Sequence, residues 1–140
     1  MKIILSVFLL LSVPVAAFSQ AKPSAVTRKT FKNCTELTET ILLTSPRVKK
    51  LTTGLATRVK KNGGTGWGYR LEAAPYGADE ESGTFDYEIH ETYKDRNVTI
   101  ARFSVDPATG QLYEYDVVED EKKKIAFDKT LVKHINKVCQ

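Results

Sequence analysis

The sequence predicts an α+β fold, in which a long helix packs on an antiparallel sheet of about four strands and a short C-terminal helix follows. Apolar and polar side chains alternate over residues 85–90, which is the period of a strand with one buried face. β-Branched and aromatic residues, which fit a pleated sheet, dominate residues 98–105. The turn sequence Asp-Pro-Ala-Thr-Gly at residues 106–110 then predicts a return strand over residues 111–118.

The N-terminus has the features of a secretory signal peptide at residues 1–19. A basic start precedes an apolar run too short to cross a bilayer, and Ala17 and Ser19 suit the positions before a cleavage site. Residues 20–33 are expected to be a flexible leader, and residues 34–140 are long enough for one domain with its own core. No second apolar run reaches membrane-spanning length, so we expect a secreted chain, periplasmic or extracellular after cleavage.

Two cysteines remain after processing, Cys34 at the start of the domain and Cys139 near its end. An even pair in an exported chain predicts a disulfide, and two cysteines allow only one connectivity. A metal pair or a cysteine nucleophile would need a further ligand or a base, and only His90 and His134 could supply it. We therefore favour the disulfide over these two alternatives.

Helices are expected before and after the strands. Acidic residues at its start favour a short helix over residues 36–43. Ser45 and Pro46 suit the N-cap and first position of a longer helix over residues 46–61, which Asn-Gly ends. Its apolar residues recur at three- and four-residue steps and are expected to face the sheet: Val48, Leu51, Leu55 and Val59.

The remaining segments complete this plan. Residues 69–73 are expected to form the first strand, and an acidic, turn-rich connection follows over residues 75–83. Residues 119–124 are predicted to form a charged loop. Asp128 is the expected N-cap of the last helix, which carries Cys139 back toward Cys34.

Charge is unevenly distributed along the chain. The net charge of +4 falls to about +3 without the signal peptide, and basic residues gather on the polar side of residues 46–61. A basic helical face can bind nucleic acid or an anionic surface, but no nucleic-acid motif accompanies it. We interpret it as a solvated face and expect no nucleic-acid partner.

No catalytic, metal or cofactor site is predicted. His90 lies beside acidic residues on the polar face of its strand, but no nucleophile is placed to meet it. Four acids could converge on one sheet face and hold a cation, although they lack the close spacing of a calcium loop: Asp86, Glu88, Glu114 and Asp116. Asn33 and Asn97 match the glycosylation pattern and matter only in a host that glycosylates exported chains.

The first choice for a partner contact is the glycine-rich segment with Trp67 between Gly66 and Gly68. A phosphate-binding loop is excluded because no Lys-Ser/Thr follows and the segment leaves a helix. The indole is either presented to a partner, as at binding hot spots, or folded back to cap the core, which we favour slightly. Four tyrosines in or beside the strands could likewise be buried in the core or exposed as a binding face, and we favour the core: Tyr87, Tyr93, Tyr113 and Tyr115.

The long helix, its glycine-rich exit and the strands around residues 87–89, 101–106 and 109–116 resemble small exported PepSY-like and cystatin-like modules. The Asp-Pro-x-Thr-Gly turn is the closest match, and the resemblance covers roughly residues 46–118. The chain lacks the Gln-x-Val-x-Gly hairpin of inhibitory cystatins. The resemblance implies a secreted, non-catalytic binding or inhibitor-type module. The alternatives are a cell-envelope accessory protein that binds a small ligand, or a small hydrolase with an unrecognised site.

Overall fold

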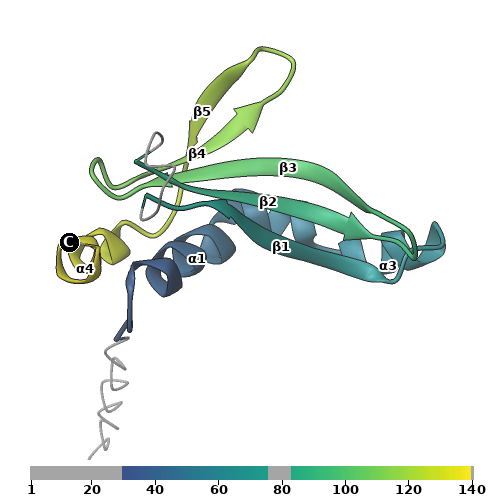
Figure 1. Cartoon of the computed structure of the whole chain (residues 1–140), viewed down its shortest axis with the longest axis horizontal. Coiled ribbons are helices and arrows are strands. Elements are labelled where there is room, and N and C mark those ends of the chain that lie inside the picture. Colours follow the sequence, from purple (N-terminus) through teal and green to yellow (C-terminus); the bar gives the residue numbers. More distant parts are fainter. Residues whose placement is uncertain (1–29, 76–82, 140) are drawn as a thin grey trace, which may run out of the picture.

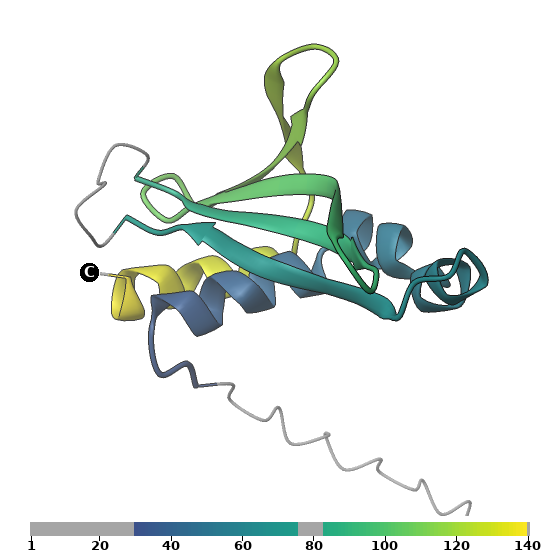
Figure 2. The same ribbon diagram turned by 45° about the vertical axis from the view of Figure 1, so that its right-hand side comes forward.

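The computed structural model describes residues 30–75 and 83–139, so the expected signal peptide lies outside the described residues. Three helices come first, and a five-stranded antiparallel sheet in the order β1-β2-β3-β4-β5 and two short helical segments follow. The elements are α1 (Cys34–Thr44), α2 (Pro46–Thr52), α3 (Leu55–Lys61), β1 (Gly66–Ala73), β2 (Phe85–Thr92), β3 (Asn97–Asp106), β4 (Gln111–Asp116), β5 (Glu121–Ile125), a 3-10 turn (Lys129–Leu131) and α4 (Val132–Val138). The helices lie together against one face of the sheet (Figure 1, Figure 2). The predicted α+β class is confirmed.

The core lies between the helices and this inner face of the sheet. Alternation along β2 places Phe85, Tyr87 and Ile89 inward, and each is at most 1% exposed. The helices and the other strands contribute further fully buried side chains: Leu37, Ile41, Leu42, Val48, Leu55, Val59, Phe103, Val105 and Leu112. The apolar stripe expected on residues 46–61 is therefore buried, apart from the half-buried Leu51.

The predicted long helix over residues 46–61 is wrong, because the chain breaks it into α2 and α3. Thr53 is extended, and Gly54 follows with φ +71°, a conformation that glycine adopts at little steric cost. The Thr53 hydroxyl donates to the Lys49 carbonyl at 2.6 Å, which closes the end of α2. Ser45 is also used differently from the expected cap: its hydroxyl donates to the Ala126 carbonyl at 2.8 Å.

The sheet has a fifth strand, β5, where a charged loop was predicted. Its sequence, Glu-Lys-Lys-Lys-Ile, has little intrinsic strand preference, and the pairing with β4 determines its conformation. Asp120 has φ +52° in the turn between the two strands. The hairpin of β4 and β5 leans away from the plane of the other strands (Figure 1, Figure 2).

A bulge in β3 accompanies this departure. Ile89 pairs with Ala101 and His90 with Thr99, which leaves Ile100 as the extra residue on β3. Pairing between β3 and β4 begins only at Arg102, opposite Tyr115, and continues to Asp106. Bulges bend a strand and increase its twist, so the divergence of β4 begins next to the bulge.

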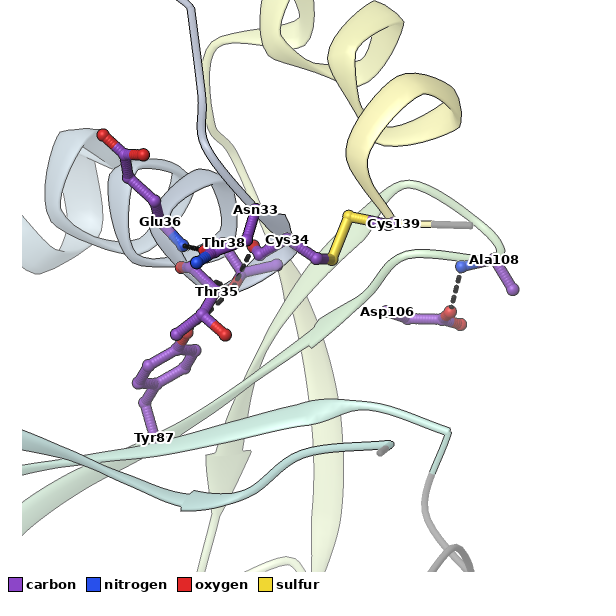
Figure 3. The surroundings of a disulfide bond; sticks show 9 residues. All are labelled: Asn33, Cys34, Thr35, Glu36, Thr38, Tyr87, Asp106, Ala108 and Cys139. Carbon is purple, nitrogen blue, oxygen red and sulfur yellow. Dashed lines mark hydrogen bonds between the residues drawn. A yellow bond between two sulfur atoms is a disulfide. The ribbon is translucent and has the colours of Figure 1, made fainter. Parts of the chain in front are cut away.

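The two ends of the described chain are joined. Cys34 at the start of α1 and Cys139 after α4 form the predicted disulfide, with 4.6 Å between their Cα atoms (Figure 3). Phe31, which belongs to the expected leader, is only 9% exposed, and its ring meets His134 edge-on at 5.2 Å. The Asp106 carboxylate accepts hydrogen bonds from the backbone of Ala108 and Thr109, which fixes the predicted turn after β3.

Candidate functional site

The face of the sheet turned away from the helices, called here the outer face, carries the largest arrangement of polar side chains. The register places one residue from each strand in a row across it: Arg70, Glu88, Arg102, Tyr115 and Lys122. Alternation puts these residues opposite the inward set of each strand. No helix of the described residues covers this face (Figure 2).

Glu88 is the buried anchor of this row. Its side chain is only 3% exposed, and the Arg70 guanidinium lies 2.8 Å from its carboxylate. The Thr99 hydroxyl donates to the same carboxylate at 2.7 Å. Burial alone would raise the pKa of Glu88, but the Thr99 hydrogen bond and the Arg70 charge outweigh it and hold the pKa below its ordinary value. Glu88 is therefore a fixed negative charge that orients its neighbours.

His90 lies beside this anchor and over Gly68. Its Nδ1 atom is 3.4 Å from the Glu88 carboxylate and, within the described residues, makes no hydrogen bond. A Cβ atom added to Gly68 would approach His90 Nε2 to 3.0 Å, so a glycine in β1 leaves room for the ring. The imidazole is 12% exposed and is held between strands rather than presented to solvent.

The charges of the outer face are layered. The two arginines of the row are outermost, with 58% of the Arg70 side chain and 51% of the Arg102 side chain exposed. Glu72 contacts both arginines at 3.5 Å and is 32% exposed, whereas Glu88 is buried beneath them. Lys122 and Lys124 are exposed at the β5 end of the same face. The solvent-facing charge is consequently positive although acids and bases are both present.

Two hollows meet at Arg102 and Tyr115. One, of about 290 Å³, is lined on the outer face by Glu72, Asp86, Ser104 and Lys122 among others. The other, of about 210 Å³, lies where β4 leaves β3 and is lined by Thr99, Ile100, Ala101, Glu114 and Val117 as well as the shared pair. The Tyr115 hydroxyl donates to Asp120, a bond that raises the pKa of Tyr115. The phenol ring is thereby held between the two hollows.

The four acids that could have held a cation together do not share one face of the sheet. Asp86 and Glu88 lie on the outer face, where the Ser104 hydroxyl donates to Asp86 at 2.5 Å. Glu114 and Asp116 belong to the inner set of β4, and Arg47 of α2 holds Glu114 through two bonds of 2.6 and 2.7 Å. The described residues contain no cluster of three or more potential metal ligands from His, Cys, Asp and Glu.

The glycine-rich segment is not a loop throughout, because Gly66, Trp67 and Gly68 are the first residues of β1. Trp67 pairs with Glu91 and is partly buried against the core. This packing favours the core-capping alternative for the indole, while its role as a partner contact stays a prediction. Gly64 is closely packed, since a Cβ there would collide with the Val59 side chain.

The sequence alone did not predict that these outer-face residues form one row across the sheet. The first four strands were predicted, but the pairing of Arg70 with Glu88 and of Arg102 with Tyr115 depends on register. The Asp-Pro-Ala-Thr-Gly turn contained a signal for the second pair, because counting outward from the hairpin places Tyr115 opposite Arg102. The bulge at Ile100 and the fifth strand had no comparable signal.

Comparison with known proteins adds no assignment: no protein family, curated protein or solved structure matches this chain. Across residues 30–75 and 83–139, none of the helices has the length and apolar character needed to cross a membrane.

Proposed function

We propose that this protein is an exported, non-catalytic binding module that takes an acidic segment of a partner protein on its outer face. Export is supported by the signal-peptide pattern at residues 1–19 and by the disulfide, a bond typical of oxidising compartments. The resemblance to PepSY-like and cystatin-like modules points to the same class of function.

The layered charge of the outer face carries this proposal. Glu88 is buried, and the exposed Glu72 contacts both arginines at 3.5 Å, so the solvent-facing cations that an approaching partner meets are Arg70, Arg102 and Lys122. The arginines are already oriented by the acids beneath them, so little side-chain freedom is lost on binding. A surface of this kind complements carboxylates.

An acidic polypeptide fits this surface better than an inorganic anion. The row is wide, since it crosses all five strands at about 4.8 Å per strand. Arginine presents a planar fork that binds carboxylates through two bonds, and Tyr115 offers a rigid ring beside it. Tyrosine and arginine are the residues enriched at protein-binding hot spots.

The hydrolase alternative has less support from the described contacts. His90 is the histidine nearest to acids, but its ring lies between Gly68 and Glu88 and is joined by no hydrogen bond to a serine or threonine in the described residues. Cys34 and Cys139 are joined to each other. A small-ligand role would use the hollows at Tyr115, and comparing free glutamate with its polymer separates that role from binding of a polypeptide.

Binding of poly-L-glutamate at low salt tests the proposal. We expect the double variant Lys122→Glu/Lys124→Glu to weaken this binding at least about tenfold, because two exposed cations of the outer face are reversed. The matched control is Lys49→Glu/Lys50→Glu, which changes the net charge equally on the exposed side of α2. Titration calorimetry at two salt concentrations measures both variants.

Equal losses in both double variants would show attraction to net charge and overturn the outer-face site. Binding of glutamate as the free amino acid with the affinity of the polymer would instead support a small-ligand protein. Both double variants replace exposed residues for which no ion pair is described, so thermal melting should stay close to that of the parent protein.

A further inference from the structure

Half of β3 has a strand partner on one side only. Residues 97–101 pair with β2, except for the bulged Ile100, whereas β4 pairs with residues 102–106 alone. Within the described residues this half of β3 has no strand on its other side, because the hairpin of β4 and β5 leans away (Figure 1). A strand with an open side presents unpaired backbone donors and acceptors, which can template another strand.

This open stretch lacks the charges that usually protect a sheet edge. Strand β5, at one margin of the sheet, carries Lys122, Lys123 and Lys124, and β1, at the other, carries Arg70 and Glu72. Charged residues on edge strands discourage pairing with other chains. Residues 97–101 of β3 are Asn-Val-Thr-Ile-Ala, with no charge and no proline.

A hollow with apolar residues, and with Arg102 and Glu114 in its lining, lies beside the stretch. Val98 is 39% exposed, and Val117 at the start of the β4–β5 turn is 73% exposed. The hollow of about 210 Å³ lies between Thr99, Ile100 and Ala101 on one side and Tyr115 and Val117 on the other. An incoming strand would therefore find space and apolar contacts beside the open backbone.

We propose that an extended segment of a partner protein adds as a strand to residues 97–101 of β3. This inference goes beyond the outer-face proposal, because the added strand would lie along the edge of the sheet and adjoin only Arg102 of the row. Arg96 and Arg102 bound the open stretch, and their side chains are 62% and 51% exposed although Asp95 lies 3.3 Å from the first and Glu72 3.5 Å from the second. The charge pattern fits a segment with β-branched apolar residues at its centre and an acidic residue at each end.

A second copy of this chain fits less well. Antiparallel self-pairing centred on Thr99 would set Asn97 opposite Ala101 and therefore Arg96 opposite Arg102. Like charges directly opposite each other destabilise a strand pair, and this would occur twice in a symmetric dimer. The acidic-flanked segment turns the same two arginines into favourable contacts.

A blocked heptapeptide, Glu-Val-Thr-Val-Thr-Val-Glu, is the probe for this surface. In the unbound protein, amides of residues 97–101 that point away from β2 should exchange rapidly with solvent. Saturating peptide should slow their exchange by at least about tenfold, measured by NMR. The same peptide with proline in place of its central valine cannot continue the ladder and should not protect them.

Val98→Lys places a charged side chain on the open stretch, like the lysines that discourage strand pairing on β5. It should therefore weaken peptide binding at least about tenfold. Val118→Lys is the matched control, since Val118 is 85% exposed on the turn and does not line the hollow. Both variants add a positive charge, so general attraction to the acidic peptide would strengthen binding in both. A loss confined to Val98→Lys supports strand addition.

Three results would overturn the inference: slow exchange of all amides of residues 97–101 in the unbound protein, no peptide binding at about 1 mM, or equal weakening by both valine variants. A dimer in sedimentation equilibrium that Val98→Lys abolishes would replace the partner segment with a second copy. If the peptide binds as expected while Lys122→Glu/Lys124→Glu leaves poly-L-glutamate binding unchanged, that result would overturn only the outer-face proposal.

Discussion

Tyr87 and Thr38 form a polar contact inside the core, where β2 meets α1. Their hydroxyl oxygens lie 2.7 Å apart, and the tyrosine is 1% exposed (Figure 3). The Thr38 hydroxyl is also 3.0 Å from the carbonyls of Cys34 and Thr35. Burial raises the pKa of Tyr87 to about 12, because the phenolate would lose its hydration. The folded state therefore holds this tyrosine neutral well into the alkaline range.

Alkaline unfolding should report this residue. Because the pKa of Tyr87 is raised in the folded state, this residue makes its full contribution to the free energy of unfolding below about pH 10. That contribution is lost as the pH rises toward about 12. We expect the free energy of unfolding to fall over this range in the parent protein and to fall less in Tyr87→Phe. Urea unfolding of both proteins at several alkaline pH values measures the difference.

The other tyrosines with raised pKa values, Tyr69, Tyr93 and Tyr115, are present in both proteins, so their contribution cancels in the comparison. Parallel pH curves for the two proteins would contradict the assignment. At neutral pH, Tyr87→Phe should cost about 1 kcal/mol for the lost hydrogen bond.

The break between α2 and α3 shows how one residue shapes an element. Gly54 has φ +71°, and no atom beyond its own neighbouring residues lies within 4 Å of the place that a Cβ would take, so the constraint there is backbone conformation and not space. The turn allows Val48 of α2 and Leu55 and Val59 of α3 to reach the same core from two short helices. A single straight helix is not required to bury them.

Gly54→Ala should therefore destabilise the protein by about 1 kcal/mol, because alanine is strained at positive φ. Gly66→Ala is the matched control, as Gly66 also has open space around it but does not have a positive φ. Thermal or urea unfolding compares the two variants. A neutral or stabilising effect of Gly54→Ala would indicate that the two helices can merge.

Patterns that depend on a few neighbouring residues were predicted well from the sequence. Local sequence chemistry explains the alternation in β2 and the turn after β3. It also explains the glycine of that turn, Gly110, which has φ +59°. Strand β5 was missed because three lysines disfavour a strand, and only its pairing with β4 outweighs them. The break at Gly54 was missed because the apolar periodicity continues through it.

The outer face depends on relations between elements, which single-strand patterns do not contain. From the sequence, Asp86 and Glu114 could both lie on the polar face of the sheet. However, β2 turns its odd-numbered residues toward the core, whereas β4 turns its even-numbered residues toward it. The register across β3 decides this, and it also brings Arg70 to Glu88 and Arg102 to Tyr115. Two of the four proposed cation ligands are consequently on the helix side of the sheet.

At the scale of the whole molecule, the disulfide ties the first helix to the last. Cys34 and Cys139 are 105 residues apart in sequence, and α1 and α4 lie side by side (Figure 1, Figure 2). A crosslink over so long a loop stabilises mainly by restricting the unfolded chain. The bond therefore acts on the stability of the entire domain rather than on a local contact.

Replacing both cysteines, Cys34→Ala/Cys139→Ala, should lower the free energy of unfolding by about 2 to 5 kcal/mol and leave the sheet intact. Urea unfolding and far-UV circular dichroism measure the two effects. A reducing agent should destabilise the parent protein similarly and leave the double variant unchanged. Two unpaired thiols in unreduced protein, detected by mass spectrometry, would contradict the pairing.

The same bond determines how the domain responds to pulling. Tension applied between the two chain ends would pass from residue 34 to residue 139 through one covalent bond and bypass the helices and strands. Without the bond, the chain between the cysteines, which are 105 positions apart, could extend to about 350 Å. An oxidised molecule stretched by its ends would keep its sheet under load, and only reduction would expose the fold to mechanical force.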